Sequence, residues 1–553
     1  MNSIFITSLI LISEIMFDPD PQVGLPPFEY VEWYNPGADT IDLTGWQWMV
    51  GDKVRRLSGG HINPGGYVIV CSPSAASAFR TFGDVVALES FPSLRNSGDR
   101  LVLLNPEGIA VHTVDYSPDA FTDARKANGG WSLELTDPIN YCNALAWQPS
   151  VDPAGGTPGK ANSQSIEVPE TDVSMLLRAG GYDDQRFFLM FSGILDPANS
   201  MNNYSCFLMP GEIIVTPAAP PEYGFPGLFF QIPAGLDPGM IYTLEVNGNV
   251  KDCSGRNALV RPVLLGFPTK PDSADLIISE VMFDPLAGQS EFVEIFNRSQ
   301  KVVELSGLIL ARADATGNII AFSDQQNLSY WLFPGGYAVF TSDARMFIKS
   351  WPDSDAAATA GRTDMPSLTN EESMLILMDA GQRVLDRVIY SPDWHYAYLE
   401  ETKGVSLERI DFQTSGSNRE NWLSASAASG FCTPGAKNST AFGPEPDSKQ
   451  QFWLDPTVGY SSNANGPVQV AVRYRFDEPG WFIRVNIVTS QGLPVKEIFP
   501  FGMAGAEGTI IWDGLDTGQR IVTDGIYLVV ADYYHPTGKK GRWKKACAVL
   551  RNY

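Results

Sequence analysis

The stretch Leu276–Asn297, LIISEVMFDPLAGQSEFVEIFN, occurs a second time at Ile10–Asn35 as ILISEIMFDPDPQVGLPPFEYVEWYN. A repeat of this kind decides the architecture before any other feature, because each copy predicts one structural unit of the same kind. The sequence therefore predicts a chain of modules, two of which share one fold.

The length and composition indicate several globular β domains. A chain of 553 residues is too long for a single core. Hydrophobic residues make up 44% of it and aromatic residues 11%, which is typical of folded domains. The 51 glycines and 40 prolines separate short runs of Val, Ile, Leu and Phe, and this pattern favours all-β modules with many turns.

The charge argues against polyanionic partners. The chain carries 39 basic and 63 acidic residues, a net charge of −24. Such a body repels nucleic-acid phosphates and anionic membranes, so we expect no nucleic acid among its partners. An acidic surface keeps a protein soluble and also suits an extracellular or cell-surface setting.

The repeat divides the chain into four predicted modules: 8–165, 166–273, 274–440 and 441–553. The first and third share further landmarks in the same order, namely Leu43-Thr44-Gly45-Trp46 with Leu305-Ser306-Gly307-Leu308, Pro64-Gly65-Gly66-Tyr67 with Pro334-Gly335-Gly336-Tyr337, Tyr116-Ser117-Pro118-Asp119 with Tyr390-Ser391-Pro392-Asp393, Ser132-Leu133-Glu134 with Ser406-Leu407-Glu408, and Thr157-Pro158-Gly159 with Thr433-Pro434-Gly435. Insertions fall between the landmarks, as they do in β-sandwiches whose loops vary while their strands are kept.

In the first module the series ISEIMFDP, EYVEWYN, LTGW, NPGGYVIV and GGTPGKAN resembles the lamin tail domain of secreted bacterial proteins. The resemblance implies an immunoglobulin-like β-sandwich and brings no catalytic residues. In nuclear lamins the domain is an interaction module with DNA among its partners. The acidic charge here argues against DNA binding, for which a basic face uniting Arg55, Arg56 and Arg95 would be the sign.

The other two modules resemble other Ig-like families. The order FSGILD, NYSCF, YTLEV and KDCSG in residues 166–273 is similar to bacterial Ig-like spacer domains. Gly508–Gly514 and Asp524–Leu528 in the last module resemble the FlgD-type Ig-like domain, which is similar to the C-terminal sorting modules of type IX secretion cargo in Bacteroidetes. The basic run Lys539–Lys545 is interpreted as a solvated edge strand, with a contact to export machinery or an anionic polymer as the alternative.

No arrangement of residues predicts catalysis. The four histidines, His61, His112, His395 and His535, lie in different modules and beside no nucleophile motif, and no zinc motif is present. The acidic cluster Asp18, Asp20, Glu29 and Glu32 has the counterparts Asp284, Glu291 and Glu294. We expect Glu32 and Glu294 to accept hydrogen bonds from loop backbone; a Ca²⁺ site at Asp18 and Asp20 and glycoside hydrolysis are the alternatives. We assign no catalytic, cofactor-binding or metal-binding residues.

The cysteines suggest two disulfide bonds, as expected for an exported protein. Cys206 and Cys253 are the only pair in the second module, and Cys71 and Cys142 are the only pair in the first. Cys432 and Cys547 are alone in their modules and are predicted to be free. Trp46, Trp48, Trp131 and Trp147 are interpreted as sandwich core, because Leu308, Leu310, Val405 and Trp422 stand in the same places of the second copy.

We expect no intact signal peptide in the apolar stretch near the start of the sequence. The apolar run at residues 4–17 has no basic residue before it, and Ile10–Phe17 aligns with the first strand of the second copy. No stretch has the length of a transmembrane helix. We nevertheless expect an extracellular or cell-surface location.

These observations predict an elongated, all-β protein of four tandem Ig-like β-sandwich modules. Its expected role is a non-catalytic, exported structural or adhesive scaffold that binds an extracellular protein or polysaccharide. The contact residues are expected on loops that differ between the copies, such as Asp18–Pro27 and Asp314–Trp331. The alternative function is an accessory or binding chain of an extracellular hydrolase, namely a nuclease, phosphoesterase or glycosidase.

Overall fold

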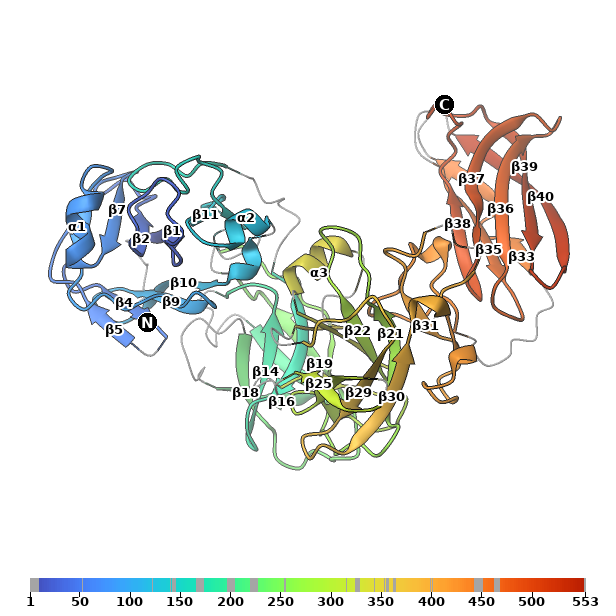
Figure 1. Ribbon diagram of the computed structural model, residues 1–553, viewed down its shortest axis with the longest axis horizontal. Coiled ribbons are helices and arrows are strands. Elements are labelled where there is room, and N and C mark those ends of the chain that lie inside the picture. Colours follow the sequence, from blue (N-terminus) through green and yellow to red (C-terminus); the bar gives the residue numbers. More distant parts are fainter. Residues whose placement is uncertain are drawn as a thin grey trace. The chain divides into compact units, whose positions relative to one another are not determined.

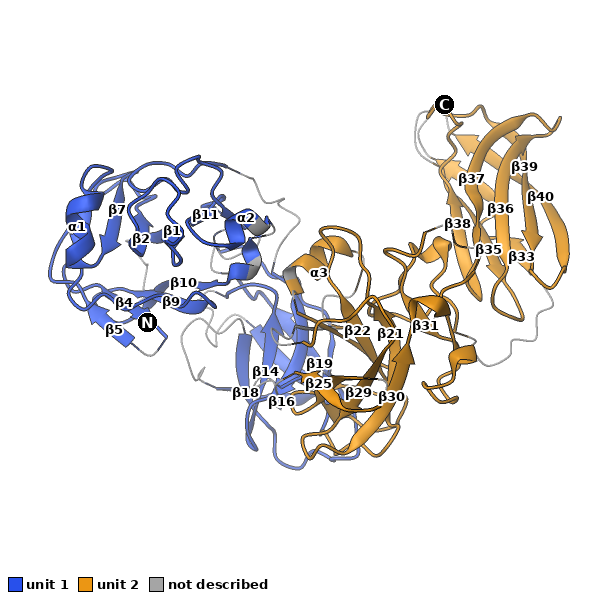
Figure 2. Ribbon diagram, in the orientation of Figure 1, with its two compact units in different colours: residues 1–267, 328–331 blue, residues 268–327, 332–553 orange. Residues whose placement is uncertain are grey.

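The computed structural model divides into two compact units, residues 1–267 with 328–331 and residues 268–327 with 332–553 (Figures 1 and 2). The residues that it describes are 9–51, 53–121, 123–139, 141, 146–165, 174–195, 204–218, 227–252, 255–314, 316–323, 329–342, 344–352, 354, 358–361, 365–397, 399, 401–441, 451–461 and 468–551. Nearly all of the regular structure in these residues is β-strand.

The first copy of the repeat folds into two packed sheets. Its larger sheet has six strands in the order β12 (Trp147–Pro149), β11 (Leu133–Leu135), β1 (Leu11–Met16), β2 (Tyr30–Tyr34), β7 (Tyr67–Cys71) and β8 (Val85–Ala87). Its smaller sheets are β10 (Ala110–Tyr116), β9 (Asp99–Leu104), β4 (Gln47–Val50) and β5 (Lys53–Arg56), and the pair β3 (Ile41–Asp42) and β6 (His61–Ile62). The core between the sheets contains Trp33, Trp48 and Leu101, all without solvent exposure.

Short helices lie against or beside the sheets. The helix α1 (Pro73–Phe79) covers the outer face of the six-stranded sheet, where Phe79 packs on Tyr30 with ring centroids 4.9 Å apart. The helix α2 (Ala124–Ala127) is a single turn that begins after Asp123. The 3₁₀ turns are Pro118–Ala120, Pro392–Trp394, Arg419–Asn421 and Ala427–Ser429.

The second copy repeats this topology strand for strand. Its six-stranded sheet has the order β28 (Thr359–Gly361), β27 (Tyr337–Thr341), β22 (Phe292–Asn297), β21 (Leu276–Met282), β31 (Leu407–Arg409) and β32 (Trp422–Ser424). Its smaller sheets are β25 (Ile319–Phe322), β24 (Ile309–Ala313), β29 (Ser373–Met378) and β30 (Val384–Tyr390), and the pair β23 (Val303–Glu304) and β26 (Trp331–Leu332). The helix α3 (Ala344–Ser350) takes the place of α1.

Two further pairs of sheets complete the fold. Between the copies lie the sheets β13 (Leu176–Gly181), β14 (Arg186–Phe191), β18 (Gly227–Gln231), β17 (Pro217–Ala218), and β16 (Ile213–Val215), β15 (Tyr204–Met209), β19 (Tyr242–Gly248), β20 (Val263–Leu265). After the second copy lie β33 (Phe452–Leu454), β35 (Val470–Arg475), β38 (Glu507–Trp512), and β34 (Val458–Ser461), β40 (Lys540–Arg551), β39 (Gly525–Tyr534), β36 (Phe482–Thr489), β37 (Pro494–Met503).

The fold class predicted from the sequence, tandem β-sandwiches, is confirmed. The boundaries of the four modules stay predictions, because the structure divides into two compact units and not into four. The short helices α1 and α3 were not predicted; both lie on the outer face of a six-stranded sheet, where they bury side chains that a bare sheet would expose to water.

The first strand of each copy carries a bulge at the same place. The register of β1 shifts between Ile12 and Glu14, and that of β21 between Ile278 and Glu280. A bulge leaves a backbone amide without a partner on the neighbouring strand, and a buried amide must find another acceptor. The N–H of Ile12 donates to Nδ1 of His112 at 2.8 Å, and the N–H of Ile278 donates to Oδ2 of Asp386 at 2.9 Å.

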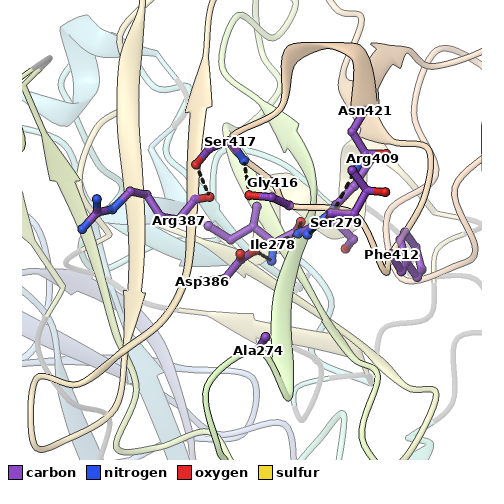
Figure 3. Close-up of polar contacts among 12 residues, drawn as sticks. Ala274, Ile278, Ser279, Asp386, Arg387, Arg409, Phe412, Gly416, Ser417 and Asn421 are labelled. Carbon is purple, nitrogen blue, oxygen red and sulfur yellow. Dashed lines mark hydrogen bonds and ion pairs between the residues drawn. The ribbon is translucent and has the colours of Figure 1, made fainter.

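The two copies therefore satisfy one amide with different chemistry. His112 is fully buried, and burial lowers its pKa to about 3, so it accepts as a neutral ring. Asp386 brings a charge instead, and the guanidinium of Arg409 lies 2.8 Å from it (Figure 3). Arg409 is 2% exposed and stands where the first copy has Leu135. The buried arginine thus compensates the carboxylate that replaces a histidine.

This exchange predicts how the buried pair can be replaced. Arg409→Leu leaves the charge of Asp386 buried alone and should destabilise the second copy by about 3–5 kcal/mol. The double change Asp386→His with Arg409→Leu recreates the arrangement of the first copy and should recover most of that loss. The measurement is calorimetric unfolding of the full chain. A double variant that is no more stable than Arg409→Leu would contradict the exchange.

Candidate functional site

Three glutamates lie side by side on the six-stranded sheet of each copy. In the first copy Glu14 is directly opposite Glu32 on β2 and Glu134 on β11. Residues opposite each other in neighbouring strands project from the same face. The second copy has the same row in Glu280, Glu294 and Glu408. All six side chains are without solvent exposure. Each copy therefore buries three carboxyl groups side by side.

The last segment of each copy lies across the row and donates backbone hydrogen bonds to it. We call residues 157–163 and 433–440 the straps. In the first copy the N–H groups of Thr157, Gly159 and Ser163 donate to Glu14, Glu32 and Glu134 at 2.7, 2.6 and 2.8 Å. Each of the three carboxyl groups thus accepts one backbone N–H from the strap.

The second strap repeats the pattern. The N–H groups of Thr433, Gly435 and Thr440 donate to Glu280, Glu294 and Glu408 at 2.9, 2.7 and 2.8 Å. An asparagine then fixes each strap to the sheet: the Asn162 amide donates to the carbonyls of Ser13 and Leu135, and the Asn438 amide to those of Ser279 and Arg409. The motif Thr-Pro-Gly that the sequence shares between the copies is therefore the part of the strap that binds the row.

Hydroxyl groups complete the row. In the first copy Ser13 donates to Glu32 at 2.8 Å and Ser132 to Glu14 at 2.5 Å. Ser279 and Ser406 do the same in the second copy, and the Thr157 and Thr433 hydroxyls reach Glu134 and Glu408. Oε2 of Glu14 is buried and has no hydrogen-bond partner among the described residues.

Burial is the main electrostatic influence on the row. Burial first, and then the neighbouring carboxylates, raise the pKa of Glu14 to about 7 and that of Glu280 to about 8. The same causes place the pKa values of Glu32 and Glu294 well above the ordinary value of a carboxyl group. The Tyr30 hydroxyl donates to Glu14 at 2.8 Å and lowers its pKa; the corresponding residue of the second copy is Phe292, which has no hydroxyl.

Two glycines at the start of the first strap, Gly156 just before it and Gly159 within it, are required by space. A Cβ on Gly156 would lie 2.5 Å from Oε1 of Glu14, and one on Gly159 would lie 2.3 Å from the carbonyl of Phe82. Gly159 also has a φ of +82°, a conformation that side chains disfavour. The strap sequence is thus fixed by how closely it approaches the carboxyl groups.

The other acidic residues that the sequence singled out mostly bind nearby loops. Glu29 accepts from Ser93 and the N–H of Leu94, and its counterpart Glu291 accepts from the N–H of Leu368. The hydrogen bonds predicted for Glu32 and Glu294 to loop backbone are present. Among the described residues no three His, Cys, Asp or Glu side chains are placed to hold a metal ion; Ca²⁺ binding near Asp18 and Asp20 stays a prediction.

The sequence interpretation missed Glu14 and Glu134, together with Glu280 and Glu408. Their signal is a Ser-Glu or Ser-Leu-Glu sequence at the same place in both copies. Those glutamates were treated as landmarks of alignment, although a charged residue inside a strand that is buried on both faces is itself a sign of a polar cluster.

The histidines lie in structural positions. His112 accepts from the bulge amide, and His61 lies in β6. Nδ1 of His395 lies 2.9 Å from Oγ of Ser424, but both side chains are buried and that hydroxyl also accepts from the N–H of Tyr396. His395 packs on Phe283 as Phe121 packs on Phe17 in the first copy. Burial lowers its pKa to about 4, which suits a packed neutral ring.

The tryptophans are mostly core, as predicted. Trp46, Trp48 and Trp147 are buried between the sheets of the first copy. Trp131 differs: it is half-buried at the margin of that core, and the ammonium of Lys126 lies 4.5 Å from its ring centroid.

The two predicted disulfides involve cysteines beyond the described residues. Cys142 and Cys253 are not described, so both pairings stay predictions. Cys71 and Cys206 are buried free thiols in this structure, as are Cys432 and Cys547. Cys71 lies with α1 on the outer face of its sheet, whereas Tyr141, the residue before Cys142, packs in the core on the other face.

The basic residues do not gather into one face. Arg55 and Arg56 are neighbours on β5, so their side chains point to opposite faces, and Arg95 pairs with Asp99. The basic run begins just before β40 and continues along it. There Lys539 pairs with Glu478 and Arg542 with Asp532. Only Ala548–Arg551 of β40 pairs with β34, so Lys540–Lys545 lies on the part of the strand without a second neighbour in the described sheet, as an edge strand would.

Over the part of the chain that the structure describes, no helix is both long and apolar enough to cross a membrane.

Comparison with known proteins supports the lamin-tail part of the sequence prediction. Residues 7–118 and 269–392 each match the model of the Lamin Tail Domain family. These segments hold the first two strands of each glutamate row but end before the straps. No curated protein is similar enough to the chain to count as a relative.

Several solved structures of bacterial proteins are similar to the chain. They include the N-terminal part of the S-layer protein SbsC (14% identity, 40% of this chain and 44% of that one, TM-score 0.17), a DUF4876 family protein from Bacteroides thetaiotaomicron (12%, 42% and 88%, 0.18), and PorZ, a surface component of the type IX secretion system of Porphyromonas gingivalis (9%, 98% and 100%, 0.17). The chain spans about half the length of the two SbsC structures it matches. At such TM-scores the similarities carry no argument about function. The family match is the firm result: two segments of this chain match the Lamin Tail Domain family.

Proposed function

We propose that the chain is an exported, non-catalytic structural or adhesive protein whose sandwich modules hold contact surfaces outside the cell or on its surface. The observation that carries this proposal is the hydrogen bonding of every glutamate in the repeated polar cluster by its own strap. The six buried glutamates are occupied by hydrogen bonds from their own straps and hydroxyls. A group so placed stabilises a fold and is closed to a substrate.

The contact surface is proposed to lie where the copies differ. The edge strand β5 of the first copy reads Lys-Val-Arg-Arg, whereas the equivalent edge strand β25 reads Ile-Ile-Ala-Phe. Ile319, Ile320 and Phe322 are 49%, 56% and 59% exposed. Charged side chains protect an edge strand from pairing, and an apolar edge invites an added strand. An extended segment of a partner protein could therefore pair with the edge strand of the second copy, whereas the charged edge strand of the first copy disfavours such pairing.

Two similar modules on one chain also permit multivalent binding. A second binding event within one complex is favoured by a high effective concentration, so avidity exceeds the affinity of either module. We also propose that the last predicted module, 441–553, is a FlgD-type terminal domain. Through this domain the chain would contact the secretion machinery. The alternative proposal is an accessory chain of an extracellular hydrolase.

The first prediction separates binding from catalysis. The full chain is applied to a polysaccharide array and to isolated envelope material of the cells that make it, and the same sample is assayed for nuclease, phosphoesterase and glycosidase activity, each with Ca²⁺ and with chelator. Saturable binding without turnover is the expected result. Turnover that Asp18→Ala or Glu29→Ala abolishes would make the chain an enzyme and end the proposal.

The second prediction concerns the edge strand. Ile320→Lys with Phe322→Lys should weaken binding to the envelope material about tenfold or more, because charges on an edge strand block strand addition. The matched control is Val54→Lys, at 44% exposure on the edge strand of the first copy, which should bind as the unchanged chain does. Protease treatment of the envelope should remove the binding that depends on β25. If both variants weaken binding equally, or if neither weakens it, the edge strand β25 is not the contact.

A further inference from the structure

Each glutamate row contains more carboxyl groups than it can hold as anions. Glu14 is flanked at once by Glu32 and Glu134, all three without solvent exposure. Like charges in one buried site cannot all be ionised, because neither water nor a counter-ion screens them. Such a row keeps at least one carboxyl group protonated when an exposed glutamate is already an anion.

No cation relieves the row among the described residues. The basic side chains of the straps point to other partners: Nζ of Lys160 lies 3.1 Å from Asp152, and Nζ of Lys437 lies 3.0 Å from Glu507. The neighbouring titratable groups are tyrosines and a thiol, which are neutral or, when ionised, anionic. They are Tyr30 and Tyr67 near the first row, and Tyr337 and Cys432 near the second. The buried faces of α1 add only Ala75, Ala76 and Phe79.

The hydrogen bonds of Glu14 fit a carboxyl group that holds a proton on one oxygen. Oε1 accepts from Tyr30, Ser132 and the N–H of Thr157, at 2.8, 2.5 and 2.7 Å. Oε2 is buried and accepts from no donor in the described residues. All three donors therefore gather on one oxygen, and the other is the place for a proton.

We propose that each glutamate row is a proton-binding site whose occupancy controls how firmly its strap is held. When the proton leaves, the row carries a further buried negative charge, and lifting the strap to admit water relieves the repulsion. The strap is the last segment before the next predicted module, so its release would lengthen the connection between modules. The inference does not depend on which partner the chain binds.

The direction of the pH dependence follows from proton linkage. With the strap lifted, a glutamate titrates near its ordinary pKa of 4.5; with the strap closed, the pKa is about 7 for Glu14 and about 8 for Glu280. The closed state binds more protons in between, so raising the pH favours the open state. The stabilisation of the strap is complete below pH 4.5 and is lost as the pH rises through about 7 in the first copy and about 8 in the second.

Hydrogen exchange of the full chain tests the proposal. The readout is the protection of the peptides that contain residues 155–164 and 432–440, corrected for intrinsic exchange, between pH 5 and 9. Protection should fall by about tenfold per pH unit for one linked proton. The fall should level off near pH 7 in the first strap and near pH 8 in the second. Peptides from β9, which lies in the four-stranded sheet and not in the sheet that carries the row, should show no such dependence.

Two neutral variants provide the matched controls. Glu14→Gln should remove the pH dependence of the first strap and leave that of the second unchanged, and Glu280→Gln should do the reverse. Strap protection that is independent of pH in the unchanged chain, or that keeps its dependence in both variants, would overturn the proposal.

A second measurement needs no variant. Infrared spectra of the unchanged chain at pH 6 should show protonated carboxyl groups that disappear toward pH 9. If every carboxyl group is ionised at pH 6, the rows bind no proton and the proposal is wrong.

Discussion

The hydrogen bonds between each strap and its glutamate row are the constraint on which the sandwich of each copy depends. Three carboxyl groups placed side by side under protein would be strongly unfavourable without donors, because each would lose its hydration. The strap supplies one backbone N–H to each, and serine and threonine hydroxyls supply the rest. The strap contains no β-strand, and its hydrogen bonds to the row hold it against the sheet. Each half is unfavourable without the other.

Comparison of the two copies shows which parts of this arrangement can change. The bulge amide donates to a neutral histidine in one copy and to an aspartate, paired with a buried arginine, in the other. Tyr30 becomes Phe292, and one hydrogen bond to the row disappears. The three glutamates and the three strap N–H donors are nevertheless present in both. Core positions therefore tolerate exchange provided that charge is compensated, whereas the row and the strap are kept together.

The repeat and the period of the strands were sufficient to predict the fold class, and the shared Glu32 and Glu294 were correctly expected to bind loop backbone. The row itself could not be predicted, because Glu14 and Glu134 lie 120 residues apart in sequence and meet only through the register of β1 and β11. Alternation along one strand does not reveal its neighbours. The helix α1 and the placement of Cys71 on the outer face were missed for the same reason: both depend on which face of a six-stranded sheet is covered.

In the function that we propose, the contacts with a partner lie on surfaces outside the row and its strap. The two edge strands β5 and β25 occupy equivalent places on sandwiches of the same topology, yet one is charged and the other is apolar and exposed. Burial does not require Ile320 or Phe322 to be apolar, since water already reaches both. The row and strap thus hold the sandwich together in both copies. The edge strand lies in the four-stranded sheet and not in the sheet that carries the row, so its sequence can differ between the copies.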